Sequence, residues 1–227
     1  MFFARDTARG ITPKRRASAR LFPLFIKHQI SYIKHVLMDP FSYLSVLISI
    51  VLALGMTGVL QGLGEMLQAR SHRRVYWVHA LWVLNIFIFL VVAWWVFYRW
   101  RFEQNWTFFL FVFVLISPTV LYLCSLLLFP REGDMSVRDY KTHYYANHRA
   151  FFTVFAFIVP VDVVDTLLKG IPHFAAQGPQ YVAASIILFS TTAAGAITHN
   201  ETYHKFFAIY CLCHIVWISF AIFHTLQ

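Results

Sequence analysis

The chain has 227 residues, of which 59% are apolar and 13% are charged, whereas soluble domains carry about 25% charged residues. A mean hydropathy of +0.61 and several long apolar runs indicate an integral membrane protein, and they exclude a secreted disulfide-rich domain and an ordinary soluble enzyme. The formal net charge is +9, and eight of the 19 Lys and Arg residues precede residue 38. Beside a membrane, such a basic segment favours anionic lipid as its partner, and no nucleic-acid partner is expected.

Residues 1–37 form a basic N-terminal extension. Its first half is typical of a solvated, disordered tail, and Leu21–Val36 is mildly amphipathic, which predicts a short helix lying in the membrane interface. The sequence that starts at Met38 resembles a natural start, so residues 1–37 are hypothesised to be a mis-assigned extension. The intact mass of the native protein tests this hypothesis.

Residues 38–227 form the predicted transmembrane domain. Six apolar runs of spanning length predict an all-α bundle of six transmembrane helices, because lipid-exposed backbone must be satisfied within each segment. The longest predicted loop, 129–150, separates the third helix from the fourth. The predicted spans are Phe41–Gly62, Val75–Val96, Trp106–Leu128, Phe151–Leu168, Tyr181–Ile197 and Tyr203–Leu226.

The loop charges indicate an orientation. The first, third and fifth loops hold eight Lys and Arg residues, and the second and fourth loops hold three. The positive-inside rule therefore places the odd-numbered loops in the cytoplasm. The basic extension adds eight positive charges to the other side, a conflict that a start at Met38 removes. We prefer cytoplasmic odd-numbered loops.

The fourth span contains the principal candidate for ion or solute binding. Asp162 and Asp165 are three residues apart and share a helix face, and Pro160 weakens the helix just before them. Carboxylates inside a membrane are costly, which makes them functional candidates for binding a cation or proton. The structural alternative is that Asp165 pairs with Lys169 while Asp162 bonds a neighbouring helix.

The second span adds two polar candidates to the same predicted route, His79 and Asn85. An imidazole can titrate near neutral pH, and an amide near the middle of the membrane can line a solute path. The alternative for both residues is hydrogen bonding between helices.

A polar cluster is predicted at the cytoplasmic face. The chain contains 11 histidines, and several of them belong to the odd-numbered loops. They would form a site that binds either a metal ion or an acidic ligand. No HExxH motif is present, and no metal is assigned. A b-type haem between His79 and His204 is a further alternative. The predicted cluster consists of Tyr144, His148, Arg149, His199 and His204.

Small residues line one side of the first span. Gly55, Gly58 and Gly62 form a strip that permits close helix packing, either within the subunit or in a homo-oligomer.

From Leu54 onward, the chain resembles a group of uncharacterised six-span inner-membrane proteins of bacteria. The residues that carry the resemblance are GMTGVLQGL, YWVHALWVLN, WTFFLF, LLLFP and YYANHRAFF. The resemblance implies a bacterial inner membrane and the same architecture, and it implies no activity.

The sequence contains no nucleophile elbow, Walker loop or Rossmann glycine pattern, which favours a non-enzymatic role. The leading hypothesis is permeation or sensing of a cation or proton. The second is a non-catalytic membrane scaffold or assembly partner. The third is a redox protein that holds haem or quinone.

Overall fold

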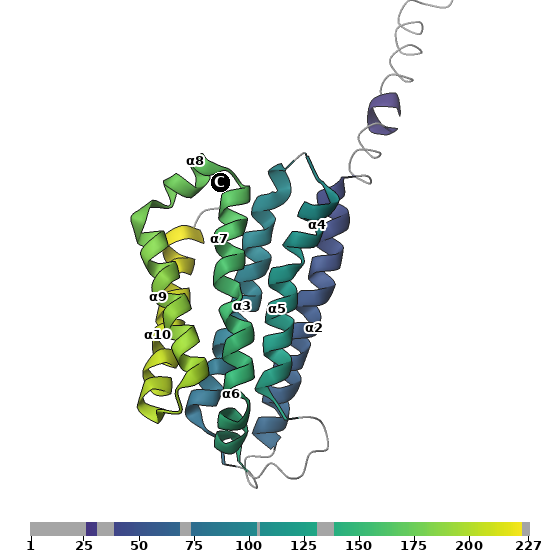
Figure 1. The fold of residues 1–227 in the computed structure, drawn as a ribbon. Coiled ribbons are helices and arrows are strands. Elements are labelled where there is room, and N and C mark those ends of the chain that lie inside the picture. Colours follow the sequence, from purple (N-terminus) through teal and green to yellow (C-terminus); the bar gives the residue numbers. More distant parts are fainter. Residues whose placement is uncertain (1–25, 31–38, 69–73, 104, 131–138, 224–227) are drawn as a thin grey trace, which may run out of the picture. The chain divides into compact units, whose positions relative to one another are not determined.

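The computed structural model describes residues 26–30, 39–68, 74–103, 105–130 and 139–223 (Figure 1). The chain divides into two units, Met1–Tyr43 and Leu44–Gln227. In the first unit, residues 26–30 are helical, within the segment predicted to lie in the interface. The remainder of the predicted extension lies outside the described residues.

Six helical spans of sufficient length and hydropathy to cross a membrane confirm the predicted all-α membrane bundle. A short helix, α8 (Ile171–Ala176), connects the fourth span to the fifth. The part of the chain that the structure describes contains no β-strand, only an isolated bridge between Arg74 and Asp139. The spans are formed by α2 (Pro40–Gln68), α3 (Trp77–Tyr98) with the 3₁₀ turn η2 (Arg99–Phe102), α4 (Phe108–Val114) with α5 (Ile116–Leu128), α6 (Tyr140–Ala156) with α7 (Ile158–Leu168), α9 (Gly178–Ile197) and α10 (Glu201–Phe223).

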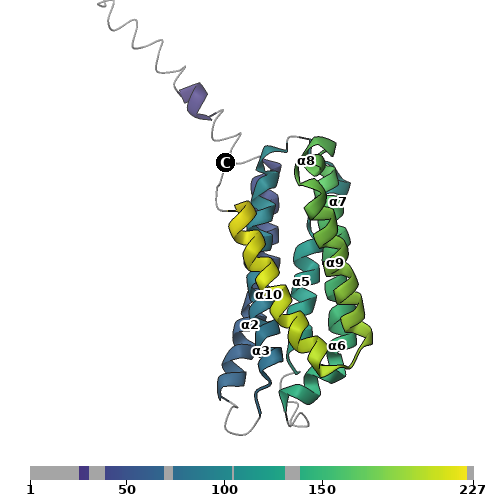
Figure 2. The same cartoon turned by 90° about the vertical axis from the view of Figure 1, so that its left-hand side faces the viewer.

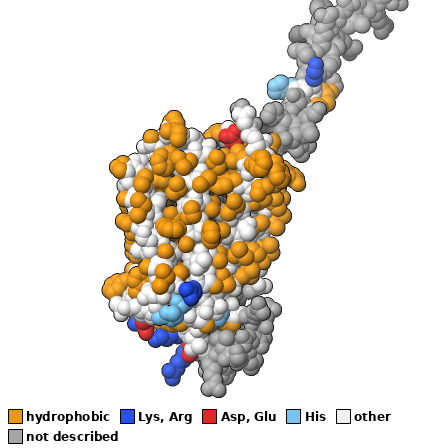
Figure 3. All heavy atoms as spheres, viewed as in Figure 1, with side chains coloured by type: hydrophobic (Ala, Val, Ile, Leu, Met, Phe, Trp, Pro, Cys, Tyr) orange, Lys and Arg blue, Asp and Glu red, His pale blue; other side chains and the backbone are white. Residues whose placement is uncertain are grey.

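The face of the second unit seen in Figure 3 is apolar around its middle and carries charged side chains at one end. On α2, for example, Ile50 and Leu54 are more than half exposed, while Leu52 is buried. Charged side chains gather at the end where α6 begins, where Glu201 pairs with Lys141 and Lys205. An apolar belt with a charged rim is the surface that a bilayer requires.

Two of the spans are interrupted near a proline. The third span breaks at Leu115, three residues before Pro118, and the fourth breaks at Phe157, three residues before Pro160. A proline ring clashes with the carbonyl four residues earlier and lacks an N–H. At both places the backbone forms a tighter turn, with a hydrogen bond to the residue three positions earlier. At the second break, Phe157 N donates to Val154 O at 3.1 Å. The predicted weakening of the helix beside Pro160 is therefore present.

The fourth span begins at Tyr140, whereas the sequence predicted a start at Phe151 and a loop before it. The Asp139 side chain caps this helix by accepting a hydrogen bond from Thr142 N at 2.6 Å. The first turns bury Tyr140, His143 and further polar aromatic side chains on one face. Hydropathy scores these residues as polar, and their helical spacing was not recognised in the sequence.

The bundle is held together by contacts of α3 with α5 and α10, and of α6 with α5 and α9 (Figure 2). The glycine strip of α2 faces these helices. A Cβ on Gly55 would lie 2.9 Å from Leu90 of α3, and one on Gly58 would lie 3.6 Å from Ser125 of α5. The strip therefore serves packing within the subunit, and a homo-oligomer formed through it stays a prediction.

Candidate functional site

The half of the bundle nearer α8 contains a partly open cavity of about 180 Å³. Side chains from α3, α5, α7, α9 and α10 line it, and most of them are apolar. The cavity is therefore an apolar space inside the spans that contains a few polar groups. Its polar lining consists of Ser117, Asp162, Asp165, Tyr181, Ser185 and His214.

Asp165 of α7 is held by two partners at the cavity wall. Its Oδ1 accepts a hydrogen bond from the Trp100 indole N–H at 2.8 Å, and Lys169 forms an ion pair with its other oxygen. The Lys169 ammonium also lies 5.1 Å from the centre of the Trp100 ring. The Trp100 bond fastens the end of α7 to η2, and the Lys169 pair is the one that the structural alternative for Asp165 predicted.

Asp162 lies one turn earlier on α7 and lines the same cavity. It accepts a hydrogen bond from the Tyr181 hydroxyl of α9 at 2.8 Å, and Thr166 contacts the same hydroxyl at 3.1 Å. Within the described residues Asp162 forms no ion pair, and the residue is exposed. A carboxylate in apolar surroundings is stable only when it is paired with a cation or has taken up a proton.

The short helix α8 lies at this end of the bundle (Figure 1). Burial, together with the positive charges of Lys169 and Arg99, lowers the pKa of His173 in α8. The lowered pKa favours the neutral form of His173 at neutral pH. Phe174 of α8 packs against Tyr181 with ring centres 6.0 Å apart, which links α8 to the residue that bonds Asp162.

A buried aromatic layer lies between the cavity and the opposite end of the bundle. On α3, Trp82 lies between His79 and the first cavity residue, Phe89, and on α6 the layer lies before the cavity residues of α7. The Trp82 ring lies 5.0–5.4 Å from four phenylalanine rings, and none of the five side chains is more than 3% exposed. The aromatic layer consists of Trp82, Phe151, Phe152, Phe155 and Phe207.

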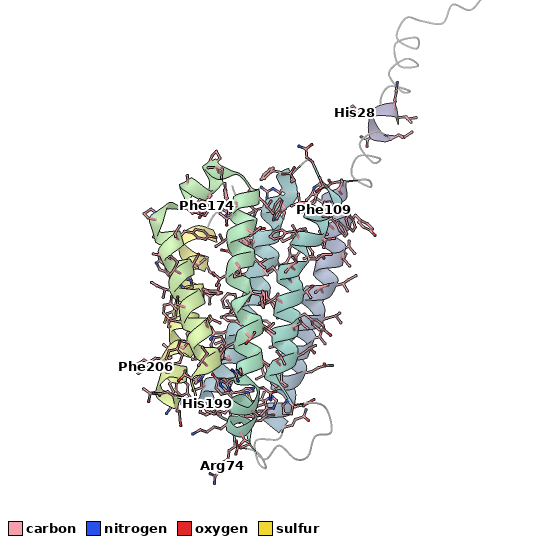
Figure 4. The ribbon with its side chains drawn as sticks, viewed as in Figure 1. His28, Arg74, Phe109, Phe174, His199 and Phe206 are labelled. Atoms are coloured by element: carbon pink, nitrogen blue, oxygen red, sulfur yellow. The ribbon has the colours of Figure 1, made fainter. Side chains whose placement is uncertain are left out.

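Beyond this layer, at the opposite end of the bundle, four of the five residues of the predicted polar cluster come together; we call Tyr144, His148, His199 and His204 the histidine cluster. The Tyr144 hydroxyl donates to His204 Nδ1 at 2.9 Å, and the His148 and His199 rings are 4.4 Å apart. Figure 4 labels His199 at this end and Phe174 at the other. The fifth predicted residue, Arg149, is exposed.

Hydrogen bonds engage both ring nitrogens of His204 and one of His79, whereas His79 Nδ1 and His148 Nε2 are buried without a hydrogen-bond partner among the described residues. His204 Nε2 donates to Thr198 O at 2.9 Å while its Nδ1 accepts from Tyr144, so both nitrogens are used. His79 Nε2 donates to Leu128 O at 2.6 Å. In the described ranges, no three His, Cys, Asp or Glu side chains are grouped as metal ligands. A haem between His79 and His204 stays a prediction.

The four residues predicted to form one ion route occupy separate places. Asp162 and Asp165 line the cavity, whereas His79 lies beside Tyr140 and His143 near the histidine cluster. Asn85 is fully buried and donates to Ala208 O of α10 at 3.1 Å. The structure therefore joins only the two aspartates, and Asn85 has the interhelical hydrogen bond that its structural alternative predicted.

Sequence reasoning missed three side chains of the cavity: Trp100, Tyr181 and His214. Neither Trp100 nor His214 is singled out as a candidate in the sequence, and Tyr181 is used there only as the start of the predicted fifth span. Their common signal was a polar atom on an aromatic ring near the depth of Asp162 and Asp165.

No protein-family model, curated protein or solved structure matches this chain. Its function is therefore inferred from the cavity and the side chains around it. The resemblance to six-span inner-membrane proteins of bacteria stays a prediction.

Proposed function

We propose that this integral membrane protein binds a cation or proton at Asp162 and acts as a sensor or receptor for it. The observation that carries the proposal is the Asp162 carboxylate, which faces an apolar cavity within the spans and has no ion-pair partner among the described residues. The neighbouring Asp165 differs, because Lys169 already neutralises it.

The aromatic layer supports binding rather than permeation. A pore needs a polar or hydrated path across the bundle, and here five buried rings that pack around Trp82 lie between the cavity and the histidine cluster. The ligand would enter and leave at the same end. With the odd-numbered loops in the cytoplasm, that end faces the outside of the bacterial inner membrane.

Thermal unfolding of the purified full chain in detergent tests the proposal, because a ligand that binds only the folded state raises the midpoint temperature. The cations to compare are H⁺ (as pH), Na⁺, K⁺, Mg²⁺, ammonium and alkylammonium ions. We expect at least one of them to raise the midpoint of the parent and to leave that of Asp162→Asn unchanged.

Glu65→Gln is the matched control, because it neutralises an exposed carboxylate on α2, outside the cavity lining. This variant should respond as the parent does. A parent that no cation stabilises would refute the proposal, and so would an Asp162→Asn variant that responds as strongly as the parent.

A non-catalytic scaffold or assembly partner is the second candidate. The observation that favours it is that both aspartates bond neighbouring elements, Asp165 through Trp100 and Asp162 through Tyr181. In a scaffold, Asp162→Asn and Tyr181→Phe would lower stability similarly, and neither the parent nor the variants would respond to cations. In a sensor, Tyr181→Phe keeps the carboxylate and should still respond.

A further inference from the structure

We infer that the ligand of this cavity is an organic ammonium ion whose apolar group is about the size of benzene, and not a hydrated or metal cation. The inference rests on the proposed function, since it names the chemical class of the cation that Asp162 binds. Three observations support it. They are the volume of the cavity, the small number of oxygen ligands in its lining, and the way in which the cavity wall already binds the ammonium group of Lys169.

The volume sets the size of the apolar part. The cavity measures about 180 Å³. An apolar protein cavity of about 150 Å³ is large enough to hold benzene. The space therefore exceeds what a bare monovalent ion fills, and it accommodates one small ring or a short alkyl chain beside a charged group.

The lining provides few oxygen ligands. Ca²⁺ and Mg²⁺ take about six or more oxygen ligands, and apart from Asp165, which Lys169 already pairs, the side-chain oxygens of the lining are those of Asp162, Ser117, Ser185 and Tyr181. An ammonium group needs only two or three acceptors for its N–H bonds. Asp162 supplies a charged acceptor, and the His214 ring, which forms no hydrogen bond within the described residues, lines the same space.

The cavity wall already binds one primary ammonium group in this manner. Lys169 pairs with Asp165, and its Nζ lies 5.1 Å from the Trp100 ring centre, which combines a charge-assisted hydrogen bond with a cation–π contact. One turn away, Asp162 offers a second carboxylate beside the aromatic ring of Tyr181, with no lysine of its own among the described residues. An ammonium ligand at Asp162 would repeat the Lys169 arrangement.

Calorimetric titration of the full chain in zwitterionic nanodiscs tests the ligand class, with empty nanodiscs as the blank. The probes are the n-alkylammonium ions from methyl to pentyl, the n-alkanols of matching length, Na⁺ and Mg²⁺. We expect the affinity to rise about fourfold per methylene until the cavity is full. Each alkanol should bind roughly tenfold more weakly than its ammonium partner, because it lacks the charge.

Two variants separate the charge from the apolar space. Asp162→Asn should abolish the preference for ammonium over alkanol. Ala93→Leu adds bulk to the cavity lining on α3 and keeps the carboxylate, so it should move the longest tolerated chain to a shorter one. Should Asp162→Asn fail to fold, Ala93→Leu still tests whether the alkyl chain of the ligand occupies the cavity.

The outcomes distinguish the two proposals. Binding of Na⁺ or Mg²⁺ at Asp162, with no gain from longer alkyl chains, would overturn the organic ligand and leave the cation site in place. Alkanols that bind the parent as well as ammonium ions do would also overturn it, because an apolar or lipid-like occupant would then fit better. If no cation of any kind binds the parent, the proposed function itself fails.

Discussion

The two ends of this bundle place polar side chains within the spans in different ways. In the histidine cluster, Tyr144 bonds His204 and His204 bonds a backbone carbonyl, so the polar groups act within a packed structure. In the cavity, Asp162 faces an open apolar space. The comparison shows that residue type alone does not identify a site: His204 is held by hydrogen bonds within the protein, while Asp162 lines a cavity with a tyrosine hydroxyl as its partner and no cation beside it among the described residues.

The largest expected effect lies in the aromatic layer that separates the two ends. Trp82→Ala removes a fully buried ring that contacts four others, and it should lower the free energy of unfolding by about 3–5 kcal/mol. The same change at Trp217, which is 57% exposed, is the control and should cost little. Unfolding by SDS titration in mixed micelles measures both. Equal losses would contradict the closed layer.

Added volume should be tolerated differently at the two ends. A Cβ on Gly62 would collide with the Phe129 ring, which packs on His79, so Gly62→Ala should destabilise by about 1–3 kcal/mol. Gly64→Ala, with open space around it, should be neutral or stabilising. Ala93→Leu in the cavity should cost less than Gly62→Ala. Thermal unfolding compares the three, and a stable Gly62→Ala would contradict tight packing near the histidine cluster.

The Tyr144 hydroxyl tests whether the histidine cluster is a structural network. Tyr144→Phe leaves the ring in place but removes the donor to His204 Nδ1, which should cost about 1–2 kcal/mol because the nitrogen stays buried. Tyr145→Phe is the control, since among the described residues its hydroxyl makes a long, 3.4 Å contact with Tyr76. An equal loss of stability in the two variants would show that the His204 bond contributes nothing specific.

The smallest effect concerns the start of α6. The Thr142 backbone N–H lowers the pKa of Asp139, so its capping contribution is complete above the unfolded pKa of about 3.9 and is lost as pH falls through the folded pKa. Asp139→Ala should cost about 0.5–1 kcal/mol at pH 7, and the difference from the parent should shrink below about pH 4. Asp139→Asn should retain most of the cap without this pH dependence. Unfolding measured from pH 3 to 7 checks both.

The spans could be predicted from the sequence because lipid exposure demands long apolar helices, and the structure has six of them. The start of α6 could not be predicted by hydropathy, because Tyr140, His143 and Tyr144 are polar aromatic residues buried on one helix face. A hydropathy window averages over all faces of a helix, so such a face does not register as part of a span.

The site could be predicted only in part. The spacing of Asp162 and Asp165 placed them on one helix face, and both line the cavity. Sequence gives the depth of a residue in a span but not the helix that faces it. For that reason the pairing of Asp162 with Tyr181 was missed, and Asn85, which bonds α10, was assigned to the same route.

The most direct test of the closed bundle is to measure binding and flux of one ion together. Full-length protein in proteoliposomes would be given butylammonium, with bound ion measured at equilibrium and transmembrane movement followed over time, for the parent and for Asp162→Asn. The account predicts saturable binding that Asp162→Asn abolishes, with no movement above that of empty liposomes. Saturable movement across the membrane that depends on Asp162 would contradict it, because the aromatic layer would then have to open.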